Sequence, residues 1–208
     1  MTLERMGIDI AERIITDKIK KGLFPFYETF FAPLRCLPVH GVEIGTASGA
    51  ALLTYARYFR YGQFIGIDAK PHLVKKLRGE LGRRGLSSRV AVACGDATNP
   101  IALLESCALP GFAAGPLDFV VDDCSHQLAQ ARASLMALWP ILRPGGFYIV
   151  EDWMAAYLRP ADYGANGGLP ALLGEVLSWM AGNSGDKRIA EVVVQPCAFL
   201  IRKELPRV

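Results

Sequence analysis

The sequence has few of the features that mark exported or membrane proteins. It contains only five cysteines in 208 residues, and none of them has the CxxC spacing of a zinc site, so reduced thiols are expected. No apolar run approaches the ~20 residues that a membrane-spanning helix needs. The N-terminus also lacks the basic start and apolar stretch of a signal peptide. These absences predict a cytoplasmic protein that does not contact a membrane.

An excess of charge of one sign is missing as well. The 23 basic and 20 acidic residues leave a formal net charge of only +3. Nucleic-acid-binding proteins need a broader positive surface to neutralise phosphates. The densest basic stretch, Lys70–Arg89, contains no aromatic residue on which a base would stack and is interpreted as a solvated helix face. A small-molecule partner is therefore expected, and no nucleic acid.

The chain does contain a regular alternation of strand and helix patterns. Its length fits a single core. Five strand patterns with helix patterns between them predict right-handed βαβ units and a parallel sheet. The strands are expected at Gly41–Ile44, Gln63–Ile67, Val90–Ala93, Leu117–Val121 and Phe147–Val150, and the helices at Ala50–Arg60, Pro71–Arg84, Ile101–Ala108 and Leu128–Leu142. Glu191–Gln195 and Ala198–Arg202 predict an antiparallel hairpin after a helix at Leu172–Met180. The sequence thus predicts an α/β, Rossmann-like fold with a mostly parallel seven-stranded sheet.

Two segments outside this alternation have their own patterns. Apolar residues recur at helical spacing over Leu3–Lys21, and the aromatic segment Phe24–Leu34 predicts a second short helix. Residues 1–37 are therefore expected to form a helical cap on a catalytic domain of residues 38–208. The segment Met154–Pro170 has no clear period and predicts a mobile loop that covers the site. The aromatic cap also indicates a homo-oligomer.

The first three strands end in residues typical of a nucleoside site. Gly45 begins a tight turn that lets the backbone approach a ligand, and the turn ends at Gly49, where a helix begins. The GxGxxG spacing of dinucleotide-binding proteins is not met. Asp68 follows about twenty residues later at the end of the second strand, where a carboxylate binds ribose hydroxyls. Asp96 ends the third strand and is placed to accept from an adenine amino group. A nucleoside ligand is predicted.

Acidic residues crowd the ends of the fourth and fifth strands. The segment Asp122–His126 follows one strand and Glu151 with Asp152 follows the other. Carboxylates held together repel unless a proton or a cation separates them, and hard oxygen ligands suit Mg²⁺. A divalent metal is therefore predicted. His126 is the only histidine that follows an acidic strand end, which makes it the candidate general base.

These successive motifs resemble those of class I S-adenosylmethionine-dependent methyltransferases. By that resemblance the residues of the first turn border the methionine end of the cofactor, namely Glu43, Gly45, Thr46, Ser48 and Gly49. Asp68 would hold the ribose, Asp96 and the backbone of Ala97 would recognise adenine, and Asp122 would end its strand beside the cofactor.

The acidic segments are more specifically similar to the metal-dependent sugar O-methyltransferases of the macrocin and mycinamicin type and to their cephalosporin-hydroxylase-like relatives. The segments Thr16–Lys18 and Phe26–Glu28 resemble that group too. The similarity implies that Asp123, Glu151 and Asp152 bind Mg²⁺ or another divalent metal and that His126 takes a proton from a hydroxyl of a sugar, a polyol or a catechol-like ring. A NAD-dependent oxidoreductase and a non-catalytic cofactor-binding module remain as alternatives, because a fold does not fix a function.

Overall fold

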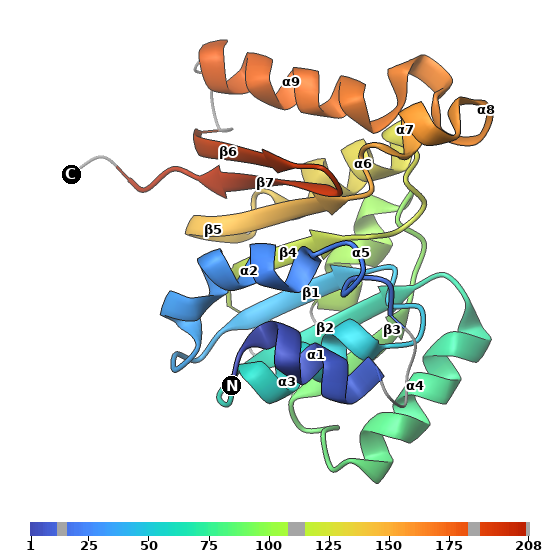
Figure 1. Cartoon of the computed structure of the whole chain (residues 1–208), viewed down its shortest axis with the longest axis vertical. Helices are drawn as coiled ribbons and strands as arrows, with labels where there is room; N and C mark the ends of the chain where they lie inside the picture. The colour runs from blue at the N-terminus through green and yellow to red at the C-terminus, as the bar shows by residue number, and fades with distance from the viewer. Residues whose placement is uncertain (12–15, 108–114, 183–187, 207–208) are drawn as a thin grey trace.

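The computed structural model of the chain describes residues 1–11, 16–107, 115–182 and 188–206. Its centre is a seven-stranded sheet with the order β3-β2-β1-β4-β5-β7-β6 (Figure 1). The parallel strands are β1 (His40–Ile44), β2 (Gln63–Asp68), β3 (Val90–Cys94), β4 (Leu117–Asp122) and β5 (Leu142–Glu151). The antiparallel strands β6 (Ile189–Gln195) and β7 (Ala198–Lys203) follow. The predicted Rossmann-like fold is confirmed.

The order of the strands reverses between β1 and β4, and this places the predicted site residues together. Ile44 of β1 pairs with Ile67 of β2 on one side and with Asp122 of β4 on the other. Val150 of β5 pairs with Asp122 in turn. The carboxyl ends of four strands therefore meet at one edge of the sheet. Ligands of doubly wound sheets bind where the strand order reverses, outside the carboxyl ends of the strands.

Helices cover both faces of the sheet. One face packs on α1 (Leu3–Ala11), α2 (Leu23–Phe31), α3 (Ala50–Tyr58) and α4 (Pro71–Arg83), and the other on α5 (Pro100–Cys107), α6 (Leu128–Leu138) and α9 (Gly168–Gly182). The strands supply both cores by alternation: Phe119 and Val121 face the first core, and Val120 between them faces the second. Figure 1 shows α1 and α2, in blue, lying across the front of the sheet. No helix of the described residues is long and apolar enough to cross a membrane.

The N-terminal segment differs from its predicted form. A single helix over Leu3–Lys21 is wrong, because α1 ends at Ala11 and residues 16–22 form bends and turns. Residues 12–15 of the prediction lie outside the described part of the chain. Gly22, with φ 66°, joins this turn to α2, and the side chain of Lys18 is buried. The sequence periodicity identified the apolar positions of the segment. It did not indicate that the charged Lys18 is buried.

The predicted loop Met154–Pro170 is also corrected. Its residues form α7 (Ala155–Leu158), α8 (Pro160–Tyr163), the 3₁₀ turn η2 (Ala165–Gly167) and the first turn of α9. Helices of four residues are too short to produce a visible period in the sequence. A second correction concerns the helix predicted to reach Leu142: α6 ends at Leu138, and β5 already begins at Leu142. Pro144 therefore lies within the strand and not in a turn before it.

Candidate functional site

The turn after β1 is held against the neighbouring strand ends by its own backbone. Gly45 has φ 86°, and its N–H donates to the carbonyl of Ile67 at 2.7 Å. A Cβ at Gly45 would lie 2.1 Å from the backbone oxygen of Asp123. Only glycine permits both the positive φ and this approach. The turn therefore fixes the end of β1 against the segment that carries the acidic residues.

Asp68, at the end of β2, organises the same turn. Its Oδ2 accepts from the N–H of Ala47 at 2.8 Å, and its Oδ1 accepts from the N–H of Lys70 at 2.9 Å. The side chain is 8% exposed. Each carboxylate oxygen has a second lone pair, so both oxygens can still accept from a ligand. Gly49, with φ 79°, ends the turn and begins α3.

Two adjoining cavities lie above these strand ends. The first has a volume of about 370 Å³ and is lined by Gly45, Asp68, Asp96 and Ala97 among others. The second, of about 340 Å³, is lined by Glu43 of β1 and by Thr46 and Ser48 of the turn among others, and Gly49 lines neither cavity. Gly45, Ala47 and Asp123 border both cavities. The two cavities therefore lie next to each other along the edge of the sheet where the strand ends meet.

The two predicted adenine residues occupy different surroundings. Asp96 is exposed, and its Oδ1 accepts from the N–H of Thr98 at 2.8 Å. This hydrogen bond holds the pKa of Asp96 below its usual value. Ala97 is buried and lines the same cavity. Asp96 is therefore presented as an ionised acceptor at the rim of the first cavity.

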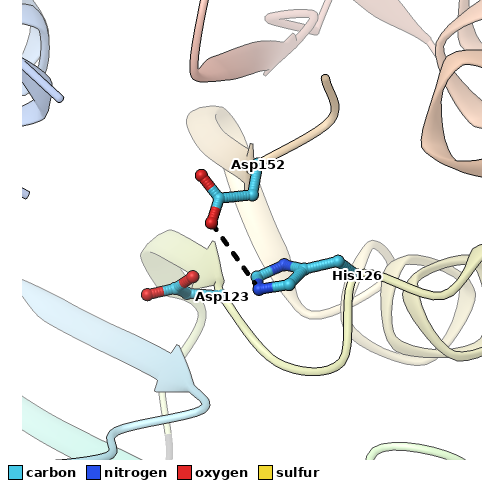
Figure 2. Close-up of side chains that lie close together, drawn as sticks. All are labelled: Asp123, His126 and Asp152. Carbon is cyan, nitrogen blue, oxygen red and sulfur yellow. Dashed lines mark ion pairs between the residues drawn. The ribbon is translucent and has the colours of Figure 1, made fainter. Parts of the chain in front are cut away.

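Three side chains with metal-binding atoms converge beside the cavities. Asp123, His126 and Asp152 each offer one atom, and these atoms lie within 4.8 Å of one another (Figure 2). The Nε2 of His126 lies 3.6 Å from Oδ2 of Asp152. The three residues come from the ends of two neighbouring strands, β4 and β5. Carboxylate oxygens with one imidazole nitrogen are donors suited to a divalent cation.

The backbone of this trio is unusual. His126 and Asp152 both have φ 56°, in the left-handed region that residues other than glycine rarely adopt. The Asp152 N–H donates to the carbonyl of Cys197 at 2.7 Å, and the His126 ring packs against Tyr163 of α8. Such conformations persist when surrounding contacts hold them, and they cluster at functional sites.

Glu151 lies next to this trio but turns inward. It is fully buried, its Oε1 accepts from Nζ of Lys18 at 2.5 Å, and the hydroxyl of Tyr27 donates to the same oxygen. Its Oε2 is buried and has no hydrogen-bond partner among the described residues. The pKa of Glu151 is raised to about 8 by burial and by the nearby Asp123 carboxylate, while Lys18 opposes the shift.

Lys18 also links Glu151 to the cofactor side of the site. Its Nζ lies 2.7 Å from Oδ2 of Asp123 and 3.4 Å from Oε1 of Glu43. Glu43 is buried with its Oε2 unpaired within the described residues, as is the hydroxyl of Thr46. Burial raises the pKa of Glu43 to about 7. A positively charged ligand group near Glu43 would stabilise its ionised form.

Lys18, Lys21 and Tyr27 were not predicted as site residues from the sequence. Lys21 lies on the same turn as Lys18, and its Nζ contacts Oδ2 of Asp152 at 2.7 Å. Two sequence signals pointed to this region without giving a role: the segments Thr16–Lys18 and Phe26–Glu28 resemble the sugar O-methyltransferases, and several strand-end carboxylates in one place require positive charge nearby. The need for positive charge does not identify which of the 23 basic residues supplies it.

Asp122 and Cys124 flank Asp123 in the sequence but do not belong to the trio. Asp122 is buried, and its Oδ2 accepts from the hydroxyl of Tyr148 at 2.9 Å. Burial raises the pKa of the Cys124 thiol, and the nearby Asp122 raises it further. A thiol that stays protonated is a poor nucleophile, so Cys124 is not a candidate nucleophile.

The fold and the site define an α/β protein of the doubly wound class. Its strand order reverses beside a glycine turn, a strand-end aspartate and an acidic cluster, an arrangement typical of nucleoside-binding proteins. Comparison with known proteins identifies its family. Residues 42–153 match the methyltransferase domain family, and the chain belongs to that family. The match includes the strand ends that carry the predicted site. It favours the methyltransferase interpretation over the NAD-dependent oxidoreductase.

Similar proteins act on sugars of natural products. The chain is 36% identical over 146 residues to the 8-demethyl-8-alpha-L-rhamnosyl tetracenomycin-C 2'-O-methyltransferase of Streptomyces olivaceus, a match covering 67% of this chain and 35% of that protein. It is 34% identical over 146 residues to the mycinamicin VI 2''-O-methyltransferase of Micromonospora griseorubida, covering 64% and 32%. The matched region is thus about a third of these relatives' length.

A solved structure gives the same picture for the fold. The MycE methyltransferase from the mycinamycin biosynthetic pathway, in complex with Mg and SAH, superposes with a TM-score of 0.74 at 25% identity. The alignment covers 94% of this chain and 54% of that one. The family predicted from the strand-end motifs is therefore confirmed.

Proposed function

We propose that the chain is an S-adenosylmethionine-dependent O-methyltransferase that acts on a hydroxyl of a small molecule and uses a divalent metal. The acceptor class is a sugar or polyol of a natural product, or a catechol-like ring. The observation that carries this proposal is the pair of cavities that share Gly45, Ala47 and Asp123, with Asp68 on one side and the trio of Asp123, His126 and Asp152 beside them.

The cofactor fits the first part of this arrangement. Asp68 would bind the ribose hydroxyls, and Asp96 with the backbone of Ala97 would bind adenine. Glu43, Gly45, Thr46, Ser48 and Gly49 would border the methionine end, with Asp122 supporting the strand beneath. The unpaired buried oxygens of Glu43 and Thr46 support this placement, because buried polar atoms nearly always have a partner and the methionine ammonium would supply one.

A divalent metal fits the second part. Asp123, Glu151 and Asp152 would hold it, as the resemblance implies, and the unpaired buried Oε2 of Glu151 is a donor atom that lacks a protein partner among the described residues. Two lysines neutralise only two of the four carboxylates of Glu43, Asp123, Glu151 and Asp152, so a further cation is needed when Glu43 and Glu151 are ionised. When bound, the metal would act as a Lewis acid and lower the pKa of the acceptor hydroxyl.

His126 would act as the general base. Its ring is held between Asp152 and Tyr163, close to the proposed metal ligands. An acceptor hydroxyl would transfer its proton to an imidazole nitrogen. The oxygen lone pair would then form the new carbon–oxygen bond while the carbon–sulfur bond breaks and its electrons stay on sulfur. The protein's part is to hold oxygen and methyl carbon in line, with α7 and α8 excluding water.

The test uses a cofactor with a deuterated methyl group. The chain is incubated with it, Mg²⁺ and a panel of glycosides carrying vicinal hydroxyls, together with catechols, and products are followed by mass spectrometry. One acceptor should gain one labelled methyl per S-adenosylhomocysteine formed, and EDTA should stop the reaction. Cofactor binding without transfer to any acceptor would favour the non-catalytic alternative.

Three broader expectations belong to this proposal. Residues 1–37 would act as a helical cap on the catalytic domain 38–208. The protein would work in the cytoplasm, in keeping with its five free cysteines within the described residues. It would take a small-molecule acceptor and no nucleic acid or membrane, and it would form a homo-oligomer, which light scattering on the purified chain would test.

A further inference from the structure

The acidic cluster is contacted throughout by one short N-terminal turn. Residues 16–22 precede α2 and lie outside residues 42–153, the region matched by the methyltransferase domain family. Lys18 from this turn contacts Asp123, Glu151 and Glu43, and Lys21 contacts Asp152. This turn therefore supplies positive charge to four carboxylates of the site. The other three acidic residues of the site, Asp68, Asp96 and Asp122, have no contact with these two lysines among the described ion pairs.

The contacts of Lys18 are selective for particular oxygens. Its ammonium takes Oδ2 of Asp123 at 2.7 Å and Oε1 of Glu151 at 2.5 Å. Tyr27 also donates to Oε1 of Glu151. Oε2 of Glu151 has no donor among the described residues. The lysine and the tyrosine thus hold one edge of the carboxylate and leave its other oxygen available.

We propose that Lys18 is a positioning residue for the divalent-ion site. Its ammonium fixes the orientations of Asp123 and Glu151, so that the oxygens it does not contact bind the ion. The same group lies 3.4 Å from Glu43 and so connects the ion side of the site with the cofactor side. This inference rests on the proposed function, because it assumes that the acidic residues bind a divalent ion.

Burial explains why such a contact would orient the carboxylates firmly. Lys18 is 4% exposed and Glu151 is fully buried, so water does not replace the hydrogen bonds between them. Outer residues that hold metal ligands typically contribute about 10- to 100-fold to metal affinity. A positive charge close to a cation site also repels the cation. The two effects have opposite signs, and a binding measurement separates them.

The experiment measures Mn²⁺ binding by electron paramagnetic resonance, with the whole chain saturated with S-adenosylhomocysteine. Lys18→Met removes the ammonium and should raise the Kd for Mn²⁺ by about 10- to 100-fold. Lys18→Gln keeps a polar side chain in case methionine prevents folding, and the same rise is expected. Lys18→Arg retains the charge and should stay closer to the wild-type Kd. Lys20→Met changes an exposed lysine of the same turn and should leave the Kd unchanged.

The outcomes are distinct. An unchanged or lower Kd in folded Lys18→Met or Lys18→Gln overturns the positioning role, and a lower Kd would identify Lys18 as a competitor of the ion. A Lys18→Arg variant as weak as Lys18→Met also overturns it. Absence of Mn²⁺ binding to the wild-type chain would instead contradict the metal site of the proposed function.

Discussion

Asp68 holds the turn after β1 and is proposed to bind the ribose of the cofactor. A substitution there should weaken cofactor binding without removing a group that takes part in methyl transfer. The Asp68 oxygens accept from the N–H groups of Ala47 and Lys70, which fixes the carboxylate at the edge of the first cavity. Asp68→Asn replaces one accepting oxygen by a donating amide and removes the charge. Hydrogen bonds to charged groups contribute about 1.5–3 kcal/mol, so the Kd for S-adenosylhomocysteine should rise by roughly 10- to 100-fold. Calorimetric titration measures it.

The control for Asp68 is an acidic residue remote from the cavities. Glu105 on α5 is exposed, and Glu105→Gln should leave the affinity for S-adenosylhomocysteine unchanged. Equal affinities of Asp68→Asn and the wild-type chain would remove Asp68 from the ribose role, provided that both proteins melt at similar temperatures.

His126 is expected to accept the proton of the acceptor hydroxyl and to make no contribution to cofactor binding. Because its φ is 56°, asparagine is the preferred replacement, since asparagine tolerates the left-handed region better than alanine. His126→Asn should lower kcat by about 10²- to 10⁴-fold, the usual contribution of a general base. The affinities for S-adenosylhomocysteine and Mn²⁺ should stay near the wild-type values.

The metal measurement distinguishes two roles of this histidine. A large loss of Mn²⁺ affinity in His126→Asn would make His126 a ligand of the ion, as its position beside Asp123 and Asp152 allows. His72→Ala changes an exposed histidine at the start of α4 and serves as the control, with kcat unchanged.

Strand-end carboxylates were predictable from sequence because the topology brings the carboxyl ends of parallel strands to one edge. Asp68, Asp96 and Asp123 each follow a recognisable strand, and each lines the first cavity. Lys18 was not predictable in this way. Its partners lie 105 and 133 residues away, and only the folded turn directs its side chain inward.

The short helices α7 and α8 depend on one glycine at the start of α9. Gly168 has φ 60° and ψ −158°, a region essentially limited to glycine. A Cβ there would lie 2.4 Å from the Tyr163 carbonyl and 2.5 Å from the Cβ of Ala156. Gly168→Ala should therefore lower the free energy of unfolding by about 1–3 kcal/mol, the usual cost of such strain, and lower kcat through displacement of Tyr163 from His126. Urea denaturation and steady-state kinetics test both effects.

A second glycine of α9 provides the matched control. Gly174 is exposed, and a Cβ there would meet nothing within 4 Å. Gly174→Ala should raise the free energy of unfolding by about 0.5–1 kcal/mol, because alanine favours the helix over glycine. Stability of Gly168→Ala equal to that of Gly174→Ala would contradict the role of Gly168.

Among the helices and strands, the longer elements were predicted from the sequence, and helices of a single turn were not. The segment Leu172–Met180 lies inside α9, and the C-terminal hairpin agrees with β6 and β7. The elements α7 and α8 span four residues each, about one helical turn, so no repeating apolar position marks them. Their contacts with the site, such as the Gln127 side chain donating to the carbonyl of Asp162 at 2.8 Å, arise only in the folded chain.

For the whole molecule, a parallel sheet with its acidic strand ends at one edge was predicted from the sequence, and the structure gives the strand order. Alternating strands and helices with right-handed crossovers leave few topologies, and the acidic strand ends then meet where the order reverses. The sequence predicted that these carboxylates repel one another, but it did not show which of them are buried. Glu43 and Glu151 are both buried, and burial raises the pKa of each from 4.5, to about 7 and about 8 respectively.

These raised pKa values predict how the stability of the metal-free protein varies with pH. The folded chain binds the two protons more tightly than the unfolded chain, so their stabilising contribution is complete below pH ~4.5. It is lost as the pH rises through about 7 and about 8. Between pH 5 and 8 the contribution of these groups to the free energy of unfolding should therefore fall. Urea denaturation in EDTA across this range measures the slope.

A saturating divalent ion should reverse this trend. The ion interacts with ionised carboxylates and not with protonated ones, so its stabilisation of the folded chain grows as Glu151 loses its proton. Repeating the urea series with excess Mg²⁺ should give a smaller decline between pH 5 and 8, and the difference between the two series should be largest near pH 8. Two series of equal slope would mean that Mg²⁺ does not bind at the buried carboxylates, and the acidic cluster would then be balanced by Lys18 and Lys21 alone.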